Sequence, residues 1–408
     1  MPQKPEPIAV LGFGCISALG LEIDQMRAAL RAGRDGVSEV DFKLLRGGHV
    51  SIAAQITDFL PDEHFSKREL NTLDRFAALA LVAAQQAVED ANIDAGQLKG
   101  PKTAVIVGSG IGGQTALDQG YEAAFSDKPQ RFDPTLVPRI MVNAAASNIG
   151  MRYGCTGPVL ALSTACASAT QCVGLGLEML RSGQVDLAVV GGAEAMATAY
   201  SLRTWEALRV LTPDRCRPFS RKRNGMVLGE GAGIFVLQRL SNAVEQGFEP
   251  KALLTGYGTS SDAVDLLRPD AEGAARAMTS ALTSAACKAE QIDYINAHGT
   301  GTLANDANET SAIKLAFGDH AAKLAVSSTK AMHGHAIGAA GAIELAATLI
   351  ALQDQFAPPT INWVERDPTC DLDYVPNQSR DMSIERALSN SFAFGGINAC
   401  LVAERWKA

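Results

Sequence analysis

Two segments that lie far apart in the chain share one pattern of residues. Residues 7–18 have the sequence PIAVLGFGCISA, and residues 251–262 have the sequence KALLTGYGTSSD. Each combines a short apolar run, which predicts a β-strand, with Gly-aromatic-Gly and then small polar residues. A repeat of this kind restricts the fold, because both copies are expected to occupy equivalent places. We therefore expect two similar halves, residues 1–248 and 249–408, packed together.

Strand patterns alternate with helix patterns in both halves. Strands are expected at 103–107, 158–162 and 293–297, and helices at 75–91, 173–181, 274–287 and 339–352. This alternation predicts an α/β fold with largely parallel or mixed sheets. Functional residues in such folds gather in loops at one edge of the sheet, so we expect a site where the two halves meet.

The composition narrows the class of protein. The chain has 408 residues, of which 47% are hydrophobic and 20% are charged, and this is typical of a large globular protein. We see no uninterrupted apolar run of the roughly 20 residues that span a bilayer, and no signal-peptide pattern at the start. We expect a cytoplasmic protein without a membrane span. The net charge of −8 argues against nucleic-acid binding.

Cofactor motifs are weak. No two of the eight cysteines form a C-x-x-C pair, which favours reduced thiols. His333 and His335 form an H-x-H pair without a companion cluster in the sequence, so we expect no metal site. Residues 108–113 match G-x-G-x-x-G, but the acidic strand end expected about 20 residues later is missing. These glycines are expected to allow close backbone packing and not nucleotide binding.

Cys166 stands at the start of a predicted buried helix. It lies between the apolar run 158–162 and residues 167–181, which are small or apolar on nearly every face. Unpaired N–H groups and the helix dipole favour a thiolate at such a position. Taken alone, Cys166 is more simply interpreted as a structural buried thiol.

Three glycine-rich loops change that interpretation. Residues 296–302 carry His298, residues 327–341 carry Lys330 and His335, and residues 390–398 carry Phe394 and Asn398. Two histidines in glycine-rich turns, together with a cysteine at a helix start, indicate an active site built for nucleophilic catalysis.

At these residues the chain resembles the β-ketoacyl-acyl-carrier-protein synthases, specifically the elongating, free-standing Cys-His-His type, over essentially its whole length. The resemblance implies a thiolase-like fold of five layers, αβαβα, with two pseudo-symmetric halves. It implies a decarboxylative Claisen condensation between an acyl chain on Cys166 and malonyl-carrier protein. Substrates would be carried on the phosphopantetheine of acyl-carrier protein, and no metal, nucleotide or redox cofactor would be needed.

The resemblance also assigns residue roles. His298 and His335 would stabilise the enolate, with Lys330 beside them, and the backbone N–H groups of Cys166 and Phe394 would form an oxyanion hole. Further residues are expected to support the site: Asp306 and Glu309 as acidic partners of Lys330, Asn398 as a loop anchor, Thr300 and Thr302 at the pantetheine arm, and Ile111 and Trp205 at the acyl tunnel and its mouth.

Partners follow from the same resemblance. Carrier proteins are acidic, so we expect docking on Lys67, Arg68, Arg203 and Arg209, the last two within a basic segment at residues 203–223. An ordinary solvated loop is the alternative interpretation of that segment. The family implies a dimer, which could be a homodimer or a heterodimer with a related synthase or chain-length subunit.

Several departures leave the substrate open. Residues 261–269 look shorter than the gating loop of the fatty-acid enzymes and lack its histidine, and position 333 is His where Thr is common. The run from His298 to Asp306 resembles synthases of specialised polyketide, polyene or nodulation-lipid pathways. A thiolase acting on coenzyme A thioesters would need a second cysteine in the loop at 394–398. A chain-length subunit typically lacks the nucleophilic cysteine that this chain keeps.

Overall fold

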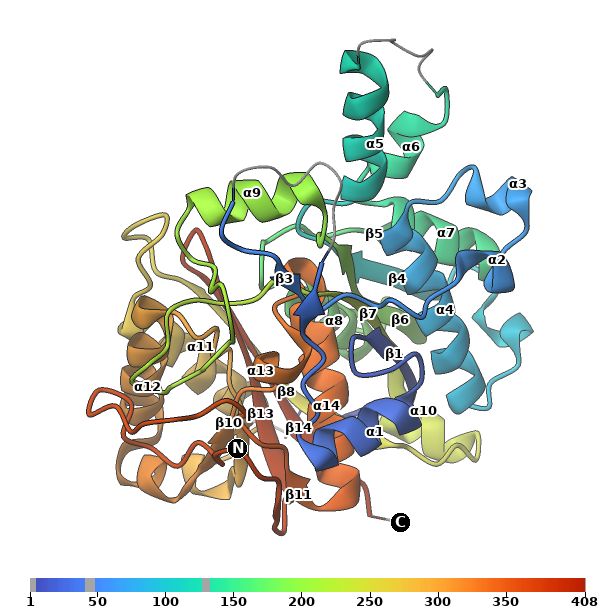
Figure 1. Cartoon of the computed structure of the whole chain (residues 1–408). Helices are drawn as coiled ribbons and strands as arrows, with labels where there is room; N and C mark the ends of the chain where they lie inside the picture. Colours follow the sequence, from blue (N-terminus) through green and yellow to red (C-terminus); the bar gives the residue numbers. More distant parts are fainter. Residues whose placement is uncertain (1–4, 41–47, 127–132, 408) are drawn as a thin grey trace.

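A ten-stranded mixed sheet runs through the protein (Figure 1). The computed structural model describes residues 5–40, 48–126 and 133–407. The strand order is β10-β9-β13-β14-β8-β1-β7-β6-β4-β5. In that order the strands are β10 (Ala325–Ser327), β9 (Tyr294–Asn296), β13 (Arg386–Ala393), β14 (Ile397–Glu404), β8 (Ala252–Ser261), β1 (Ile8–Ser17), β7 (Glu230–Arg239), β6 (Leu187–Ala195), β4 (Thr103–Gly108) and β5 (Val159–Leu160).

The sheet has internal two-fold symmetry about its centre. β1 and β8 pair with each other there, with Ile8 opposite Leu254. Going outward from this pair, β7, β6, β4 and β5 of the first half correspond in order to β14, β13, β9 and β10 of the second. The two repeated sequence segments are therefore the two central strands, which confirms that they occupy equivalent places.

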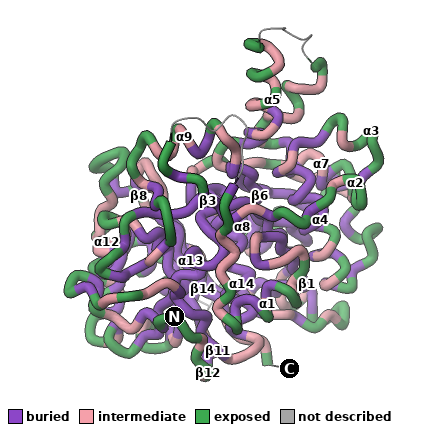
Figure 2. Tube along the Cα trace, viewed as in Figure 1, coloured by how far each residue is buried: buried purple, intermediate pink, exposed green. Residues whose placement is uncertain are grey.

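Helices cover both faces of the sheet and create five layers. α8 (Ser168–Arg181) and α14 (Ala340–Asp354) pack against each other between the two half-sheets. α4 (Arg75–Asp90) covers the outer face of the first half, and α11 (Ala271–Ser284) covers that of the second. Alternate residues of β1 face the two layers, because Ile8 and Val10 share a core with α8 and α14 whereas Ala9 and Leu11 share one with α4. Figure 2 shows the buried interior that results.

The glycines of the repeat explain why it persists in both halves. A Cβ added at Gly12 would lie 2.2 Å from the backbone nitrogen of Ala91, and one at Gly14 would lie 2.2 Å from the carbonyl oxygen of Ala83. In the second half, Gly256 and Gly258 approach the backbone of α11 just as closely. Each outer helix therefore lies directly on its central strand, and a side chain at these positions would push the two layers apart.

Smaller elements complete the molecule. The remaining helices used below are α1 (Ile23–Ala32), α3 (Lys67–Leu70), α5 (Gln114–Phe125), α6 (Leu136–Ile140), α7 (Ala144–Tyr153), α9 (Ala199–Ala207), α10 (Leu240–Glu245), α12 (Leu303–Phe317) and α13 (Lys330–His333). α5 and α6 project from the body of the molecule (Figure 1). The two five-strand sets divide between α10 and β8, and we propose residues 1–248 and 249–408 as the two halves.

Two expectations need correction in detail. The strand expected at 158–162 is reduced to the two residues of β5, and the helix expected to begin at 173 begins at Ser168. The segment Ile337–Asp354 is long and apolar enough to cross a membrane, yet 89% of it is buried inside the protein, as befits a central core helix. The glycines at 108–113 do permit close packing, since a Cβ at Gly108 would lie 2.6 Å from the carbonyl carbon of Ser168.

Candidate active site

A tight turn presents Cys166 at the entry to α8. The preceding residue, Ala165, has a positive φ of 48°, which is uncommon for a residue with a side chain. Ser168 holds this turn, because its hydroxyl donates to the carbonyl of Ala165 at 2.7 Å and accepts from the N–H of Thr164 at 2.9 Å. The sulfur is thereby fixed just before the helix begins, and Cys166 is 5% exposed. The sequence analysis missed the role of Ser168.

Two histidines from the second half meet this cysteine of the first half. The distance from Nε2 of His335 to Sγ of Cys166 is 3.1 Å. The rings of His298 and His335 lie edge to face, with centroids 5.3 Å apart. The backbone N–H of Phe394 also donates to the Cys166 sulfur. The four predicted groups thus come together at the junction of the halves.

Lys330 fixes the orientation of one imidazole. Its Nζ lies 3.3 Å from Nδ1 of His298, and it forms a buried ion pair with Glu344 of α14. Since an ammonium group can only donate, Nδ1 of His298 must be the unprotonated nitrogen and Nε2 must carry the proton. Sequence reasoning missed Glu344, although an acidic residue inside an otherwise apolar helix is a usable sign of a buried ion pair.

Burial is the largest cause of the pKa shifts of Cys166, His298 and His335. It raises the pKa of Cys166 to about 12, although the Lys330 ammonium opposes this shift. Burial therefore opposes the preference for a thiolate that was expected at the helix start. Burial, followed by the Lys330 charge, lowers the pKa values of His298 and His335 well below their usual range. These shifts favour a thiol and two neutral imidazoles in the resting site.

Asp306 and Glu309 were expected to pair with Lys330, but instead they accept hydrogen bonds from backbone N–H groups. Glu309 accepts hydrogen bonds from the N–H groups of His298 at 2.8 Å and Gly299 at 2.7 Å. Asp306 accepts from the N–H groups of Gly301 at 3.2 Å and Phe219 at 2.7 Å. Both carboxylates come from α12, so this helix is the platform on which the His298 loop rests.

A glycine turn and the loop at 261–269 are joined over the site. Asn398 donates to the carboxylate of Asp262 at 2.6 Å, which matches its expected role as an anchor. The N–H of Gly395 donates to the carbonyl of Leu266, and the N–H of Asp262 donates to the carbonyl of Gly396, both at 2.8 Å. Movement of either loop is therefore coupled to the other.

A pocket of about 130 Å³ connects this site to the surface. Cys166, His298 and His335 line it and are at most 5% exposed. Thr300 and Thr302 also line it, with their hydroxyl oxygens 3.0 Å apart. Trp205 of α9 also lines the pocket and stacks on Phe394 with ring centroids 6.0 Å apart. Ile111 does not line this pocket and is 44% exposed on this chain, so its expected place at the acyl tunnel stays a prediction.

The predicted carrier-docking residues do not form one patch on a single chain. Lys67 and Arg68 lie on α3, whereas Arg203 lies on α9 at a different side of the molecule (Figure 1). Arg203 forms an ion pair with Glu206. Arg209 follows α9 with a positive φ of 57° and has no ion pair with a described residue.

Most of the basic segment at 203–223 is neutralised locally. Arg215 pairs with Asp35, Arg217 with Asp214 and Arg221 with Glu365. Arg223 is buried and pairs with Asp367. The total charge of the segment at 203–223 is thus a poor measure of the cationic surface that it offers.

The thiol and the imidazoles also have the chemistry of metal ligands. Sγ of Cys166 and one ring nitrogen each of His298 and His335 all lie within 4.8 Å of one another, so the companion cluster that the sequence did not show exists in space. However, the Lys330 ammonium lies against His298 and would repel a cation held there. The arrangement fits proton handling better than metal binding.

Comparison with known proteins agrees with this geometry. Residues 5–243 match the family model "Beta-ketoacyl synthase, N-terminal domain", and residues 251–364 match "Beta-ketoacyl synthase, C-terminal domain". Nodulation protein E of Rhizobium sp. (strain N33) is 40% identical over 97% of this chain and 98% of its own length. 3-Oxoacyl-[acyl-carrier-protein] synthase 2 of Coxiella burnetii (strain RSA 493 / Nine Mile phase I) is 38% identical over 98% of both chains.

A solved structure extends the similarity to the whole fold. The ishigamide ketosynthase/chain length factor superposes with a TM-score of 0.94 and 35% identity, covering 99% of this chain and 100% of that one. The thiolase-like architecture expected from the sequence is thereby confirmed. The chain belongs to the β-ketoacyl synthase family.

Proposed function

We propose that this ketosynthase condenses an acyl chain held on Cys166 with malonyl-acyl-carrier protein. One observation supports this assignment above the others: a cysteine and two imidazoles meet in the lining of a single pocket. Thr300 and Thr302 line the same pocket and are suited to hydrogen-bond the amides of a pantetheine arm.

Acyl loading uses the contact between Cys166 and His335. As the sulfur attacks the incoming thioester carbon, its proton passes to Nε2 of His335 over 3.1 Å. The departing carrier thiolate then takes this proton, so the loading step is balanced and leaves a Cys166 thioester. The oxyanion forms between the backbone N–H groups of Cys166 and Phe394, and one such donor is worth about 3 kcal/mol.

Condensation uses both imidazoles. His298 presents Nε2–H because Lys330 occupies Nδ1. Nδ1 of His335 has no hydrogen-bond partner among the described residues, so no contact there fixes the tautomer of this imidazole. In this step the ring proton can therefore reside on Nε2. Two donors can then stabilise the enolate that forms when the malonyl group loses carbon dioxide. The enolate carbon attacks the Cys166 thioester, and the sulfur leaves as a thiolate. It then takes up one proton from solvent, which is the proton that the overall condensation consumes.

We place the reaction in a specialised pathway that builds a polyketide, polyene or modified fatty acyl chain. The similarity to nodulation protein E and to the ishigamide ketosynthase/chain length factor supports this choice. Primary fatty-acid elongation is the alternative, supported by the similarity to 3-oxoacyl-[acyl-carrier-protein] synthase 2. Buried free thiols at the seven cysteines other than Cys287 fit a location in the cytoplasm.

We also propose that the chain works as a dimer through the projecting α5 and α6. Tyr121, Phe125 and Val137 are 52%, 82% and 63% exposed there, which is unusual for such large apolar side chains on a free surface. The partner is a second copy of this chain or a related chain-length subunit. In the second case, this chain is the active half, because it has the cysteine and both histidines.

Intact-protein mass spectrometry tests the proposed reaction. The enzyme is mixed with a panel of acyl-carrier proteins and then chased with malonyl-carrier protein, with Cys166→Ala as the control. We expect an acyl adduct that requires Cys166 and disappears on the chase, while His298→Ala is loaded but fails to release the adduct. Loading of Cys166→Ala would overturn the nucleophile assignment. Loading from coenzyme A thioesters alone would favour a thiolase-type substrate.

A further inference from the structure

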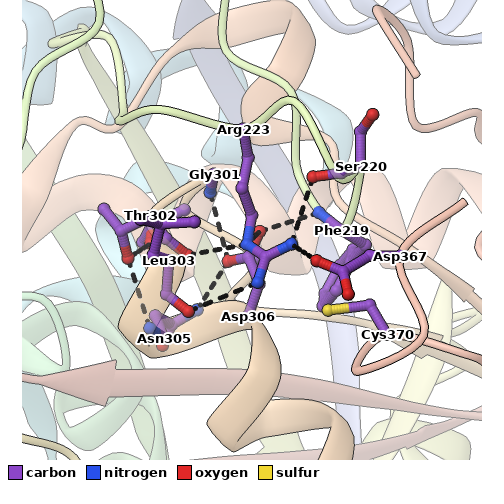
Figure 3. Close-up of polar contacts among 12 residues, drawn as sticks. Phe219, Ser220, Arg223, Gly301, Thr302, Leu303, Asn305, Asp306, Asp367 and Cys370 are labelled. Carbon is purple, nitrogen blue, oxygen red and sulfur yellow. Dashed lines mark hydrogen bonds and ion pairs between the residues drawn. The ribbon is translucent and has the colours of Figure 1, made fainter. Parts of the chain in front are cut away.

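Arg223 is a buried arginine inside the basic segment. It is 5% exposed, so it cannot serve as the docking cation that the sequence suggested. Figure 3 shows its guanidinium surrounded by acceptors from three separate segments. It donates to the carbonyl oxygens of Ser220 at 3.1 Å, Thr302 at 3.2 Å and Leu303 at 3.4 Å, and it pairs with the carboxylate of Asp367.

Asp306 completes the arrangement from the other side. Its carboxylate lies 3.9 Å from the Arg223 guanidinium and accepts a hydrogen bond from the N–H of Gly301. The Arg223–Asp306 pair therefore holds three consecutive backbone positions, 301 through 303, by one N–H and two C=O groups. Gly301 has a positive φ of 77°, so this stretch has a conformation that depends on such support.

The residues held in this way line the pocket. The hydroxyls of Thr300 and Thr302 face each other at 3.0 Å and both contribute to the pocket wall. The other end of the same loop has its own anchor, because Glu309 binds the N–H groups of His298 and Gly299. One anchor thus serves the histidine and a second serves the threonines.

We propose that Arg223 is a positioning residue for the pantetheine arm of carrier-bound substrates. It acts through the backbone of residues 301–303 to hold the Thr300 and Thr302 hydroxyls where the arm passes. This assignment rests on the proposed condensing function. Removal of Arg223 weakens substrate binding more than the chemical step, because His298 keeps its separate anchor on Glu309.

Steady-state kinetics of condensation separates the two anchors. With malonyl-carrier protein as the varied substrate, we expect Arg223→Gln to raise KM about tenfold and to change kcat less than about threefold. Glu309→Gln should show the reverse, with kcat lowered about tenfold and KM changed much less. Arg223→Lys should fall between wild type and Arg223→Gln, since an ammonium lacks the fork needed to bind three carbonyls and a carboxylate together.

Two controls isolate the pocket from the protein surface. Arg221→Gln removes an exposed arginine of the same segment, paired with Glu365, and should leave both constants unchanged. Malonyl-pantetheine, which has no carrier protein, should show the same rise in KM with Arg223→Gln. A rise confined to malonyl-carrier protein would assign Arg223 to surface docking and overturn the proposal.

The remaining outcomes are also decisive. A fall in kcat with an unchanged KM in both Arg223→Gln and the milder Arg223→Lys would show a general structural role and overturn the proposal. Unchanged constants in both would do the same. If the wild-type enzyme itself fails to condense, the proposed function is wrong, and this result is distinct from any effect of the variants.

Discussion

Lys330 is a buried charged residue that contacts an imidazole of the candidate site. It lies between Nδ1 of His298 and the carboxylate of Glu344, and both it and Glu344 are at most 1% exposed. The ion pair compensates two charges that would each be costly alone, and its ammonium sets the tautomer of His298. The buried ion pair thus also holds the imidazole of His298 in one orientation.

The first residue-scale prediction concerns this ion pair. Glu344→Leu leaves Lys330 buried without a counter-charge and should cost about 3–5 kcal/mol of unfolding free energy in urea. The double variant Lys330→Met with Glu344→Leu should recover much of that loss while remaining inactive in condensation. If the double variant is destabilised by the sum of the single losses, the two side chains are not coupled.

The second residue-scale prediction concerns His333. Burial, followed by the Lys330 charge, lowers its pKa to about 3. Below pH 6.5 the unfolded chain binds a proton that the folded chain does not, so acidification favours unfolding. Relative to His333→Thr, the wild type should therefore lose about 2 kcal/mol of stability between pH 7 and pH 5 in urea unfolding. The difference should stay constant between pH 7 and pH 8, and a flat difference down to pH 5 would contradict the prediction.

At this scale the sequence predicted the residues that cluster in the candidate site better than the residues that support them. Cys166, His298 and His335 stand in conspicuous turns, so pattern alone identified them. Glu344 is hidden in an apolar helix, and its partner Lys330 lies 14 positions earlier, so no local pattern joins them. Arg223 was grouped with its charged neighbours because sequence does not reveal which charge is buried.

At the scale of elements, α8 and α14 pack at very short range. A Cβ at Gly341 of α14 would lie 2.0 Å from the hydroxyl of Thr170 on α8 and 2.9 Å from that of Ser391. Those two hydroxyls are hydrogen-bonded to each other at 2.7 Å and are buried. α8, the helix that begins just after Cys166, is thereby seated directly on α14 of the other half.

This contact gives an element-scale prediction. Gly341→Ala should destabilise the protein by about 1–3 kcal/mol, because the added methyl group must displace Thr170 or separate the helices. Urea unfolding measures the change. Gly96→Ala is the control, since it lies in an exposed short helix and its Cβ would meet a single side-chain oxygen. Equal stability of the two variants would show that the helices can move apart freely.

Element types were predictable, but short elements and bounds were not. Long periodic stretches such as α4 and α14 were expected almost at their observed limits. β5 is an edge strand of two residues and leaves little periodicity to detect. The turn before α8 depends on a positive φ at Ala165, which alanine itself does not signal.

The whole-molecule prediction concerns assembly. Light scattering of the purified protein should give the mass of two chains. These are either two copies of this chain or one copy together with a co-expressed chain-length subunit. Replacing Tyr121 and Phe125 together by Glu should yield single chains, because two charges would be buried in the interface. Leu315→Glu, at a 60% exposed position on α12, is the control and should leave the mass unchanged. Retention of the dimer by the α5 variant would place the interface elsewhere.

For the molecule as a whole, the repeat predicted two similar halves and their α/β class. It could not predict that β1 and β8 pair to give one continuous sheet, because that pairing joins residues 8–10 to residues 252–254 and leaves no local trace. Ile111 is 44% exposed on this chain, and its place at an acyl tunnel stays a prediction.

The division of the site between two halves has a consequence during translation. Cys166 leaves the ribosome well before His335 and Phe394, and synthesis of the intervening segment takes about ten seconds or more. β1 in turn waits for β7 and β8 before its two edges are covered. Throughout this interval the nascent chain has its thiol without the two imidazoles. The candidate site is therefore complete only after the second half has been made and has packed against the first.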